Sequence, residues 1–160
     1  MSDPTQFTLD EAQLRFAKKI HGRVWTLLEK SERSKTDDEE MVDAAHASLF
    51  HWRSAGTGLN HQRGEWLITR VYTVIGDKYA AMRHAVRCWE LTEEHKDLMS
   101  DFDIAFAHEC IARAYALNGE MENAQANKEK AEQAGTEIAD AEDRKYFFSD
   151  LENGPWYILA

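Results

Sequence analysis

The sequence predicts an all-α protein in which about seven helices stack as hairpins to form an α-solenoid. The only two prolines are Pro4 and Pro155, and a long stretch without proline favours helices because proline interrupts them. Runs of β-branched residues are scarce, which argues against a sheet. Hydrophobic residues make up 43% of the 160 residues, enough for one buried core.

A repeat in the centre of the chain gives the second reason for this prediction. The stretch Arg70-Val-Tyr-Thr-Val-Ile-Gly76 returns 43 residues later as Arg113-Ala-Tyr-Ala-Leu-Asn-Gly119. The repeated structural positions are Tyr72, Gly76, Ala81, Tyr115, Gly119 and Ala124. A helical pair that recurs at a fixed period must stack on a neighbour, because it cannot bury its own apolar face. An irregular helical bundle is the alternative architecture.

Capping boxes place the first two helices. Thr8 and Glu11 begin a helix that ends at the polar stretch 31–35. Thr36 and Glu39 begin a second helix, expected over about 37–54, and the following acids suit the positive end of its dipole. We expect Gly56-Thr-Gly58 to end this helix with a glycine in a left-handed C-cap.

Glycines and caps delimit the remaining helices. We expect Gly76 to end the third helix and Gly119 the fifth, with a Ser100 cap at the start of the fifth. Gly135 and Thr136 should separate the sixth helix from the seventh. The expected ranges are about 59–75, 78–94, 100–118, 121–133 and 137–151, with a loop at 95–99.

These elements divide one expected domain, residues 1–160, into hairpins. The expected segments are a frayed start (1–7), a diverged first hairpin (8–55), a second hairpin (59–94), a third hairpin (100–134), a capping helix (136–152) and a tail (153–160). The tail carries Trp156, Tyr157, Ile158 and Leu159, and we expect it to dock on the last helix, since a terminal repeat must hide its apolar side.

Composition argues against several classes of function. The formal net charge of −10 repels phosphate backbones, so we expect no nucleic-acid partner. No apolar run is long enough to span a bilayer and no signal peptide is recognised, so we expect no membrane partner and a cytoplasmic location. Cys88 and Cys110 are expected to be reduced thiols. Because no catalytic or phosphate-binding motif is found, we expect neither an enzyme nor a cofactor.

The repeated residues resemble the tetratricopeptide repeat (TPR). In that family a small residue and a tyrosine on one helix face a turn glycine and small residues on the next. The matching positions are Thr69, Tyr72, Gly76, Ala81 and Cys88 in one copy, and Ala112, Tyr115, Gly119, Ala124 and Ala131 in the other. The chain departs from the family in its 43-residue period, in its lack of a closing proline, and in Ala85 and Lys128, which stand where an aromatic is usual. Strings such as Gly64-Glu-Trp66 are also similar to a small group of bacterial TPR-like proteins with no assigned activity.

This resemblance implies a right-handed α-α superhelix whose concave face binds a protein or peptide. The first helix of each pair lines that face in the family, which predicts exposed partner-binding residues. These residues are His21, Trp25, Arg63, Trp66, Arg70, Phe106, Glu109 and Arg113. Arginine grips carboxylates with two hydrogen bonds and tryptophan anchors interfaces, so the partner is expected to offer a carboxylate. Alternatively, Arg70 and Arg113 form internal ion pairs and Trp66 belongs to the core.

Other polar clusters give weaker functional predictions. His46, His51, Trp52 and His61 form a histidine-rich region, and His84 and Cys88 stand four apart as in some zinc sites. His46 and His51 do not share a helical face, so packing and capping roles are preferred and no metal is expected. The acids Asp140, Glu142 and Asp143, beside Arg144, are expected to cap a helix rather than act as acid–base groups.

The sequence therefore predicts a non-enzymatic, protein- or peptide-binding scaffold. The alternative is a small-molecule or metal-binding site, which could be catalytic, in the histidine-rich region between the second and fourth helices. A third hypothesis is homo-oligomerisation through the apolar tail.

Overall fold

The described part of the chain forms seven α-helices, which pack on one another in chain order. The structure is a computed structural model and describes residues 6–157. Its helices are α1 (Leu9–Leu28), α2 (Lys35–Ala55), α3 (Gly58–Ile75), α4 (Lys78–Glu94), α5 (Asp101–Asn118), α6 (Met121–Thr136) and α7 (Ala141–Glu152), with a short 3-10 turn η1 (Lys96–Leu98) before α5. No strand occurs between residues 6 and 157, so the all-α prediction is confirmed.

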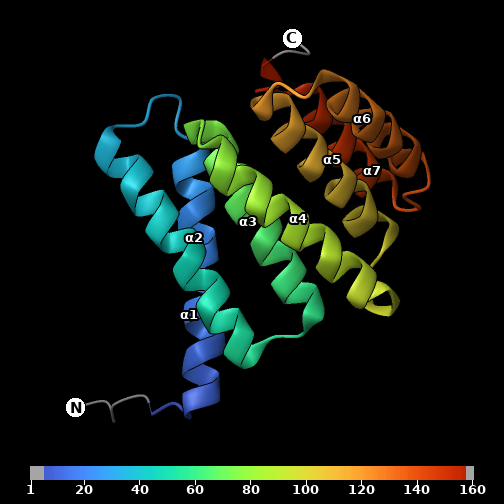
Figure 1. Cartoon of the computed structure of the whole chain (residues 1–160). Helices are drawn as coiled ribbons and strands as arrows, with labels where there is room; N and C mark the ends of the chain where they lie inside the picture. Colours follow the sequence, from blue (N-terminus) through green and yellow to red (C-terminus); the bar gives the residue numbers. More distant parts are fainter. Residues whose placement is uncertain (1–5, 158–160) are drawn as a thin grey trace.

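Each helix packs on the next, and the first helices of neighbouring pairs also meet. Figure 1 shows α1 and α2 at one end of the row, α3 and α4 in the middle, and α5, α6 and α7 at the other end. In addition to its own partner α4, α3 contacts both α2 and α5. Finally, α7 lies over α5 and α6. This order brings α1, α3, α5 and α7 to the pocket described below.

The two repeated turns have the same backbone geometry. Gly76 (φ 89°, ψ 17°) ends α3 and Gly119 (φ 80°, ψ 14°) ends α5, both in the left-handed region that favours glycine. The amide after each glycine donates to the carbonyl of the repeated tyrosine, Tyr72 or Tyr115, at 3.0 Å. The 43-residue repeat therefore corresponds to a structural repeat of the α3–α4 and α5–α6 turns.

Two helix starts follow the expected caps, and one does not. Thr8 with Glu11 forms the predicted capping box of α1, and the predicted Ser100 cap of α5 is a capping box with Asp103. For α2 the expected Thr36 cap is wrong, because Ser34 caps the helix together with Asp37. Asp37 also accepts from Lys30 at 2.7 Å. This bond and the bonds from Ser34 lower the Asp37 pKa to about 2. The cap formed by Ser34 and Asp37 thus has an additional partner in Lys30.

Two glycine predictions are wrong for a common reason, close packing. Gly56 is extended (φ −110°) rather than left-handed, and Gly58 is the first residue of α3. A Cβ on Gly58 would lie 2.3 Å from the His95 ring. Gly135 does not break the chain but lies inside α6, where a Cβ would lie 2.5 Å from Phe147. Both glycines thus allow a side chain of another element to approach the backbone closely.

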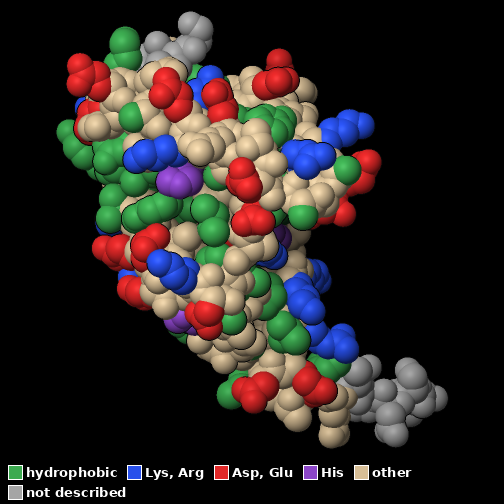
Figure 2. Space-filling view, turned by 90° about the vertical axis from the view of Figure 1, so that its right-hand side faces the viewer, with side chains coloured by type: hydrophobic (Ala, Val, Ile, Leu, Met, Phe, Trp, Pro, Cys, Tyr) green, Lys and Arg blue, Asp and Glu red, His purple; other side chains and the backbone are tan. Residues whose placement is uncertain are grey.

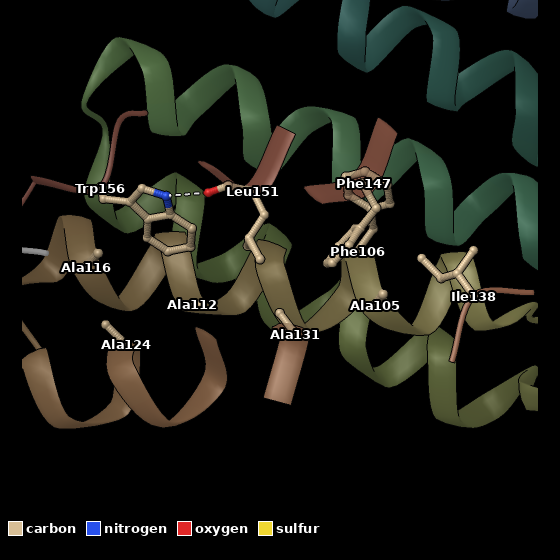
Figure 3. Close-up of a cluster of buried hydrophobic side chains, with 10 residues drawn as sticks. All are labelled: Ala105, Phe106, Ala112, Ala116, Ala124, Ala131, Ile138, Phe147, Leu151 and Trp156. Carbon is tan, nitrogen blue, oxygen red and sulfur yellow. Dashed lines mark hydrogen bonds between the residues drawn. The ribbon is translucent and has the colours of Figure 1, made fainter. Parts of the chain in front are cut away.

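Small side chains bring the helices of each pair together. Figure 3 shows a cluster in which alanines of α5 and α6 lie beneath Phe147, Leu151 and Trp156. Trp156 is buried and its Nε1 donates to the Leu151 carbonyl at 2.9 Å, so this part of the tail packs on the end of α7. The alanines drawn are Ala105, Ala112, Ala116, Ala124 and Ala131. The expected tail residues Ile158 and Leu159 lie outside the described residues.

Within the described range, no helix has both the length and the apolar character needed to cross a bilayer. Two apolar clusters besides that of Figure 3 join α1 with α2 and α3, and α4 with α5.

The repeated turns predict equal substitution effects. We expect Gly76→Ala and Gly119→Ala each to destabilise the fold by about 1–2 kcal/mol, because a left-handed backbone crowds a Cβ. Apart from the adjoining backbone, no atom lies within 4 Å of a Cβ at either position, so backbone strain is the expected cost. Gly76→Asn and Gly119→Asn should cost less, since asparagine tolerates this conformation. Urea unfolding followed by circular dichroism measures all four. Unequal costs at the two turns would contradict their equivalence.

Candidate functional site: an aromatic pocket

A cavity of about 180 Å³ opens between the alternate helices α1, α3, α5 and α7. The residues that line it are His21 and Trp25 from α1, Gln62, Arg63 and Trp66 from α3, Phe102, Asp103 and Phe106 from α5, and Tyr146 from α7. We call this cavity the aromatic pocket. Five of the eight residues predicted to bind a partner line it together, although they come from three different helices.

Aromatic rings in mutual contact form the walls of the aromatic pocket. Trp25 stacks on Trp66, with ring centroids 5.8 Å apart. Trp66 meets Phe106 edge-on at 5.3 Å, and Phe106 contacts Phe102 at 4.7 Å. Tyr146 closes the row at 6.4 Å from Phe102. Because each ring is held by the next, the pocket is formed without a ligand and offers a rigid apolar surface.

The charged residues at the aromatic pocket are an ion pair with spare donors. Arg63 Nε donates to Asp103 Oδ1 at 2.7 Å, while Asp103 Oδ2 accepts from the Ser100 amide and hydroxyl. The Arg63 side chain is 51% exposed, and its terminal nitrogens make no hydrogen bond to residues 6–157. They are therefore available to an acceptor from outside.

The hydrogen bond between Trp25 and His21 fixes the protonation state of the histidine. Trp25 Nε1 donates to His21 Nε2 at 3.0 Å, and indole nitrogen only donates. His21 Nε2 must therefore be unprotonated, so the imidazole is neutral. Burial lowers the His21 pKa below its ordinary value, and the nearby Arg63 charge lowers it further. The wall of the aromatic pocket at α1 is thus uncharged near neutral pH.

Beneath the aromatic pocket lies a buried network centred on Glu109. Its carboxylate accepts from Trp66 Nε1 at 3.0 Å, from Arg70 at 3.2 Å and from Arg113. Arg70 also donates to Asp150 of α7. Burial raises the Asp150 pKa, while Arg70 acts against this shift. Two arginines and two acids thus balance in charge and join α3, α5 and α7.

Arg113 also caps the end of α7. Its guanidinium donates to the carbonyls of Asp150 at 2.8 Å, Asn153 at 2.9 Å and Pro155 at 3.2 Å. Carbonyls at a helix C-terminus lack intrahelical partners and carry partial negative charge, so a cation there is favourable. The same side chain lies over the Trp156 ring at 4.3 Å. Arg113 therefore fixes α7, and with it Tyr146, over the aromatic pocket.

The predicted exposure is wrong for three of the eight residues. Glu109 and Arg113 are each 1% exposed, and Phe106 is 6% exposed. The ion pairs that Arg70 and Arg113 make are internal, as the alternative interpretation held. The physical reason is packing by α3 and α7: Glu109 bonds to Trp66 and Arg70 of α3, and Arg113 bonds to carbonyls at the end of α7. Arg70, Glu109 and Arg113 support the aromatic pocket from below instead of facing a partner.

Sequence reasoning missed four lining residues, Gln62, Phe102, Asp103 and Tyr146. Phe102 stands four residues before Phe106, a spacing that places both on one helical face and could have identified it. Tyr146 carries no such signal, because it reaches the pocket only through the packing of α7.

The histidine-rich region makes packing and capping contacts. His46 Nε2 and the Tyr72 hydroxyl lie 3.0 Å apart, and His61 Nε2 donates to the Trp52 carbonyl, near the end of α2, at 3.1 Å. His51 bonds to Gln13 of α1. Over residues 6–157, no group of three or more His, Cys, Asp and Glu side chains is placed to hold a metal.

The remaining candidates are a buried thiol pair and an acidic cap. Cys88 and Cys110 are both buried as free thiols, and their mutual hydrogen bond together with burial raises the Cys88 pKa. His84 bonds through Nδ1 to buried Glu65 at 2.6 Å. As expected, Asp140 caps α7, accepting from two amides of its first turn at 2.9 Å.

Removing the central acid should destabilise the protein strongly. We expect Glu109→Ala to cost about 3–5 kcal/mol in urea unfolding, because the buried Arg113 loses its counter-charge and Arg70 keeps only Asp150. Glu109→Gln keeps an acceptor and should cost less. The control is Glu90→Ala, which breaks an exposed pair with Arg87 and should cost at most about 1 kcal/mol. Equal costs for Glu109→Ala and Glu90→Ala would contradict a supporting role for the network.

Mild acid should destabilise the fold through three histidines. Burial lowers the pKa of His21, His46 and His108 below the ordinary 6.5. As pH falls below 6.5, the unfolded chain takes up protons before the folded one. The stability that these groups contribute above 6.5 is therefore lost as pH falls through their lowered values. Imidazole titration by nuclear magnetic resonance checks the three pKa values, and any of them at or above 6.5 would contradict this account.

In comparisons with known proteins, the sequence matches no family model, no curated protein and no solved structure. The residues of the site form an apolar pocket beside the terminal nitrogens of Arg63, which make no hydrogen bond to residues 6–157.

Proposed function

We propose that the protein is a non-enzymatic scaffold that binds a peptide or protein segment by inserting one apolar side chain into the aromatic pocket. The observation that carries this proposal is the wall of five contacting rings beside the half-exposed Arg63. Aromatic residues and arginine are the groups that contribute most at protein interfaces.

The size of the aromatic pocket suits one aromatic or large aliphatic group. Cavities of about 150 Å³ accept benzene, and this one measures about 180 Å³. Burial of such a group contributes roughly 1.5–3 kcal/mol. Because one inserted group gives modest affinity, the partner is expected to make further contacts outside the aromatic pocket.

Arg63 is suited to bind a carboxylate of the partner. Asp103 occupies only its Nε, so both terminal nitrogens are left without a hydrogen bond to residues 6–157. A guanidinium that donates two parallel hydrogen bonds recognises carboxylates well. The terminal carboxylate of a peptide, or an acidic side group next to the inserted apolar residue, would satisfy it.

The order of the lining helices supports a TPR-like concave groove. The aromatic pocket is lined by α1, α3, α5 and α7, as expected if the first helix of each pair faces inward along a right-handed superhelix. The outline of the molecule is indented at mid-height on the right-hand side of Figure 2. We therefore propose that the helices form a TPR-like, right-handed superhelix with this groove on its concave face.

The polar groups of the aromatic pocket favour binding over catalysis. Asp103 caps α5 and pairs with Arg63, and His21 accepts from Trp25, so both already have partners. None of the nine lining residues is serine, cysteine or lysine, the usual covalent nucleophiles. We also propose a cytoplasmic location, because the two buried free thiols suit a reducing compartment.

Small probes can test the aromatic pocket directly. We expect N-acetyl-phenylalanine to shift the indole N–H resonances of Trp25 and Trp66, and its neutral amide to bind more weakly. Arg63→Gln should remove about 1–2 kcal/mol of the preference for the carboxylate. Trp25→Ala should weaken both probes, because it removes one wall.

The matched controls lie outside the aromatic pocket. Trp89→Ala removes an indole that packs on His108, away from the lining residues, and should leave probe binding unchanged. Equal binding of the acid and the amide by the unsubstituted protein would contradict the proposed role of Arg63 in binding a carboxylate. No shift of either indole would contradict the proposal.

A further inference from the structure

The outer face of α1 and α2 carries a second concave surface, far larger and more open than the aromatic pocket. We call it the outer groove; its volume is about 1110 Å³. It is lined by Phe16, Lys19, Ile20, Gly22, Arg23 and Thr26 of α1 and by Thr36, Glu39, Glu40, Asp43, Ala44 and Ala47 of α2. Figure 1 shows these two helices at the end of the row, with no further helix beyond them.

Large apolar side chains are exposed at one end of the outer groove, where Phe16 lines it, and next to that end at Phe50. Phe16 is 52% exposed and Phe50 is 64% exposed. The His51 ring connects them, 5.3 Å from Phe16 and 5.6 Å from Phe50, so the apolar surface is continuous. At the opposite end of the row, α7 and Trp156 cover the last hairpin. An uncovered terminal pair is normally polar, so this face has the character of an interface.

The two walls of the outer groove carry opposite charges. Lys19 and Arg23 line the α1 wall, while Glu39, Glu40 and Asp43 line the α2 wall. Arg23 and Glu40 satisfy each other across the groove, through bonds of 2.6 and 2.9 Å. Lys19 and Asp43 are exposed, and within residues 6–157 neither forms an ion pair. A partner therefore needs an acid opposite Lys19 and a base opposite Asp43.

We propose that a second copy of this protein covers the outer groove, so that α1 and α2 of the two copies form a four-helix bundle with two-fold symmetry. Consider a half-turn about an axis that lies in the groove face, parallel to the two helices. It exchanges the α1 and α2 sides and keeps every residue at its own height. The basic α1 of each copy then lies on the acidic α2 of the other copy.

Contacts within each copy fix the register of this arrangement. The Ser48 hydroxyl donates to the Ala17 carbonyl at 2.9 Å, and Arg23 pairs with Glu40. Lys19 is therefore level with the stretch of α2 between Glu40 and Ser48, which contains Asp43. In the dimer, Lys19 of each copy meets Asp43 of the other.

The same symmetry places the exposed Phe16 side chain of each copy over small residues of the other copy. Phe16 is level with the end of α2 beyond Ala44, so in the dimer it seats beside Ala47 of the other copy. A helix of 20 residues is about 30 Å long, and two such helices side by side offer an area comparable to the roughly 800 Å² per partner of ordinary stable interfaces. The area and the arrangement of charges therefore suit self-association.

The dimer leaves the aromatic pocket open. His21 and Trp25 lie more than about 100° around α1 from Lys19 and Arg23, because successive residues turn by about 100°. The two sites therefore use different sides of the same helix, and binding at the aromatic pocket is a separate property.

Charge reversal tests the proposed pairing in the full-length protein. Light scattering with size exclusion and sedimentation velocity should show a dimer. Lys19→Glu alone and Asp43→Lys alone should each raise the dimer dissociation constant by about tenfold or more, since each creates two like-charge contacts. Mixing the two variants should restore association as a heterodimer, in which both contacts are again between opposite charges.

Controls separate this interface from others. Lys130→Glu, on the exposed side of α6, should leave the dimer intact. Circular dichroism should show unchanged helicity in every variant. A monomer at all concentrations would overturn the proposal and leave the outer groove to another protein. A dimer insensitive to Lys19→Glu and Asp43→Lys, or a mixture that fails to associate, would equally overturn it.

Discussion

The Glu109 carboxylate is the interaction on which the aromatic pocket depends. It is 1% exposed and accepts from Trp66, Arg70 and Arg113, which belong to two neighbouring repeats. Its hydrogen bond orients the Trp66 indole, whose ring stacks on Trp25 and meets Phe106. A buried acid is tolerable only with compensating charges, and the two arginines supply them. The arginines in turn hold α7, so one carboxylate positions both the floor and one wall of the pocket.

The repeat sets the frame within which this network forms. The turns at Gly76 and Gly119 have almost the same dihedral angles, and buried alanines let the paired helices cross closely. Positions 43 residues apart are therefore in equivalent places, yet they hold different residues. Arg63 corresponds to Phe106, and Trp66 corresponds to Glu109. Because of these two differences, the Trp66 ring meets the Phe106 ring, and the Trp66 indole N–H donates to the Glu109 carboxylate. Two identical copies would place like groups against each other.

Local sequence patterns predict most of the helices and their ends. Contacts between residues far apart in the sequence account for the predictions that are wrong. The helix α4 and the ends of α3 and α5 follow from glycines and caps a few residues away. The start of α2 was misplaced because Ser34 and Thr36 both begin a plausible cap, and only the contact of Asp37 with Lys30 separates them. In the sequence, Gly135 resembles a helix stop. In the structure it lies inside α6, where the close approach of Phe147 leaves no room for a Cβ. Sequence likewise grouped five pocket residues, but it could not reveal that α7 buries Arg113.

The position of α7 explains why two equivalent arginines have different surroundings. Arg70 and Arg113 occupy the same repeat position, and both bind Glu109. Arg113 faces the carbonyls at the end of α7 and is fully enclosed, whereas Arg70 reaches only the side chain of Asp150. An array with one more hairpin would cover its last repeat with another pair of the same kind. Here a single helix does so, and its Tyr146 reaches back across α5 to the aromatic pocket. The helix α7 therefore completes the wall of the aromatic pocket as well as the core, which links the stability of this end of the protein to the shape of the pocket.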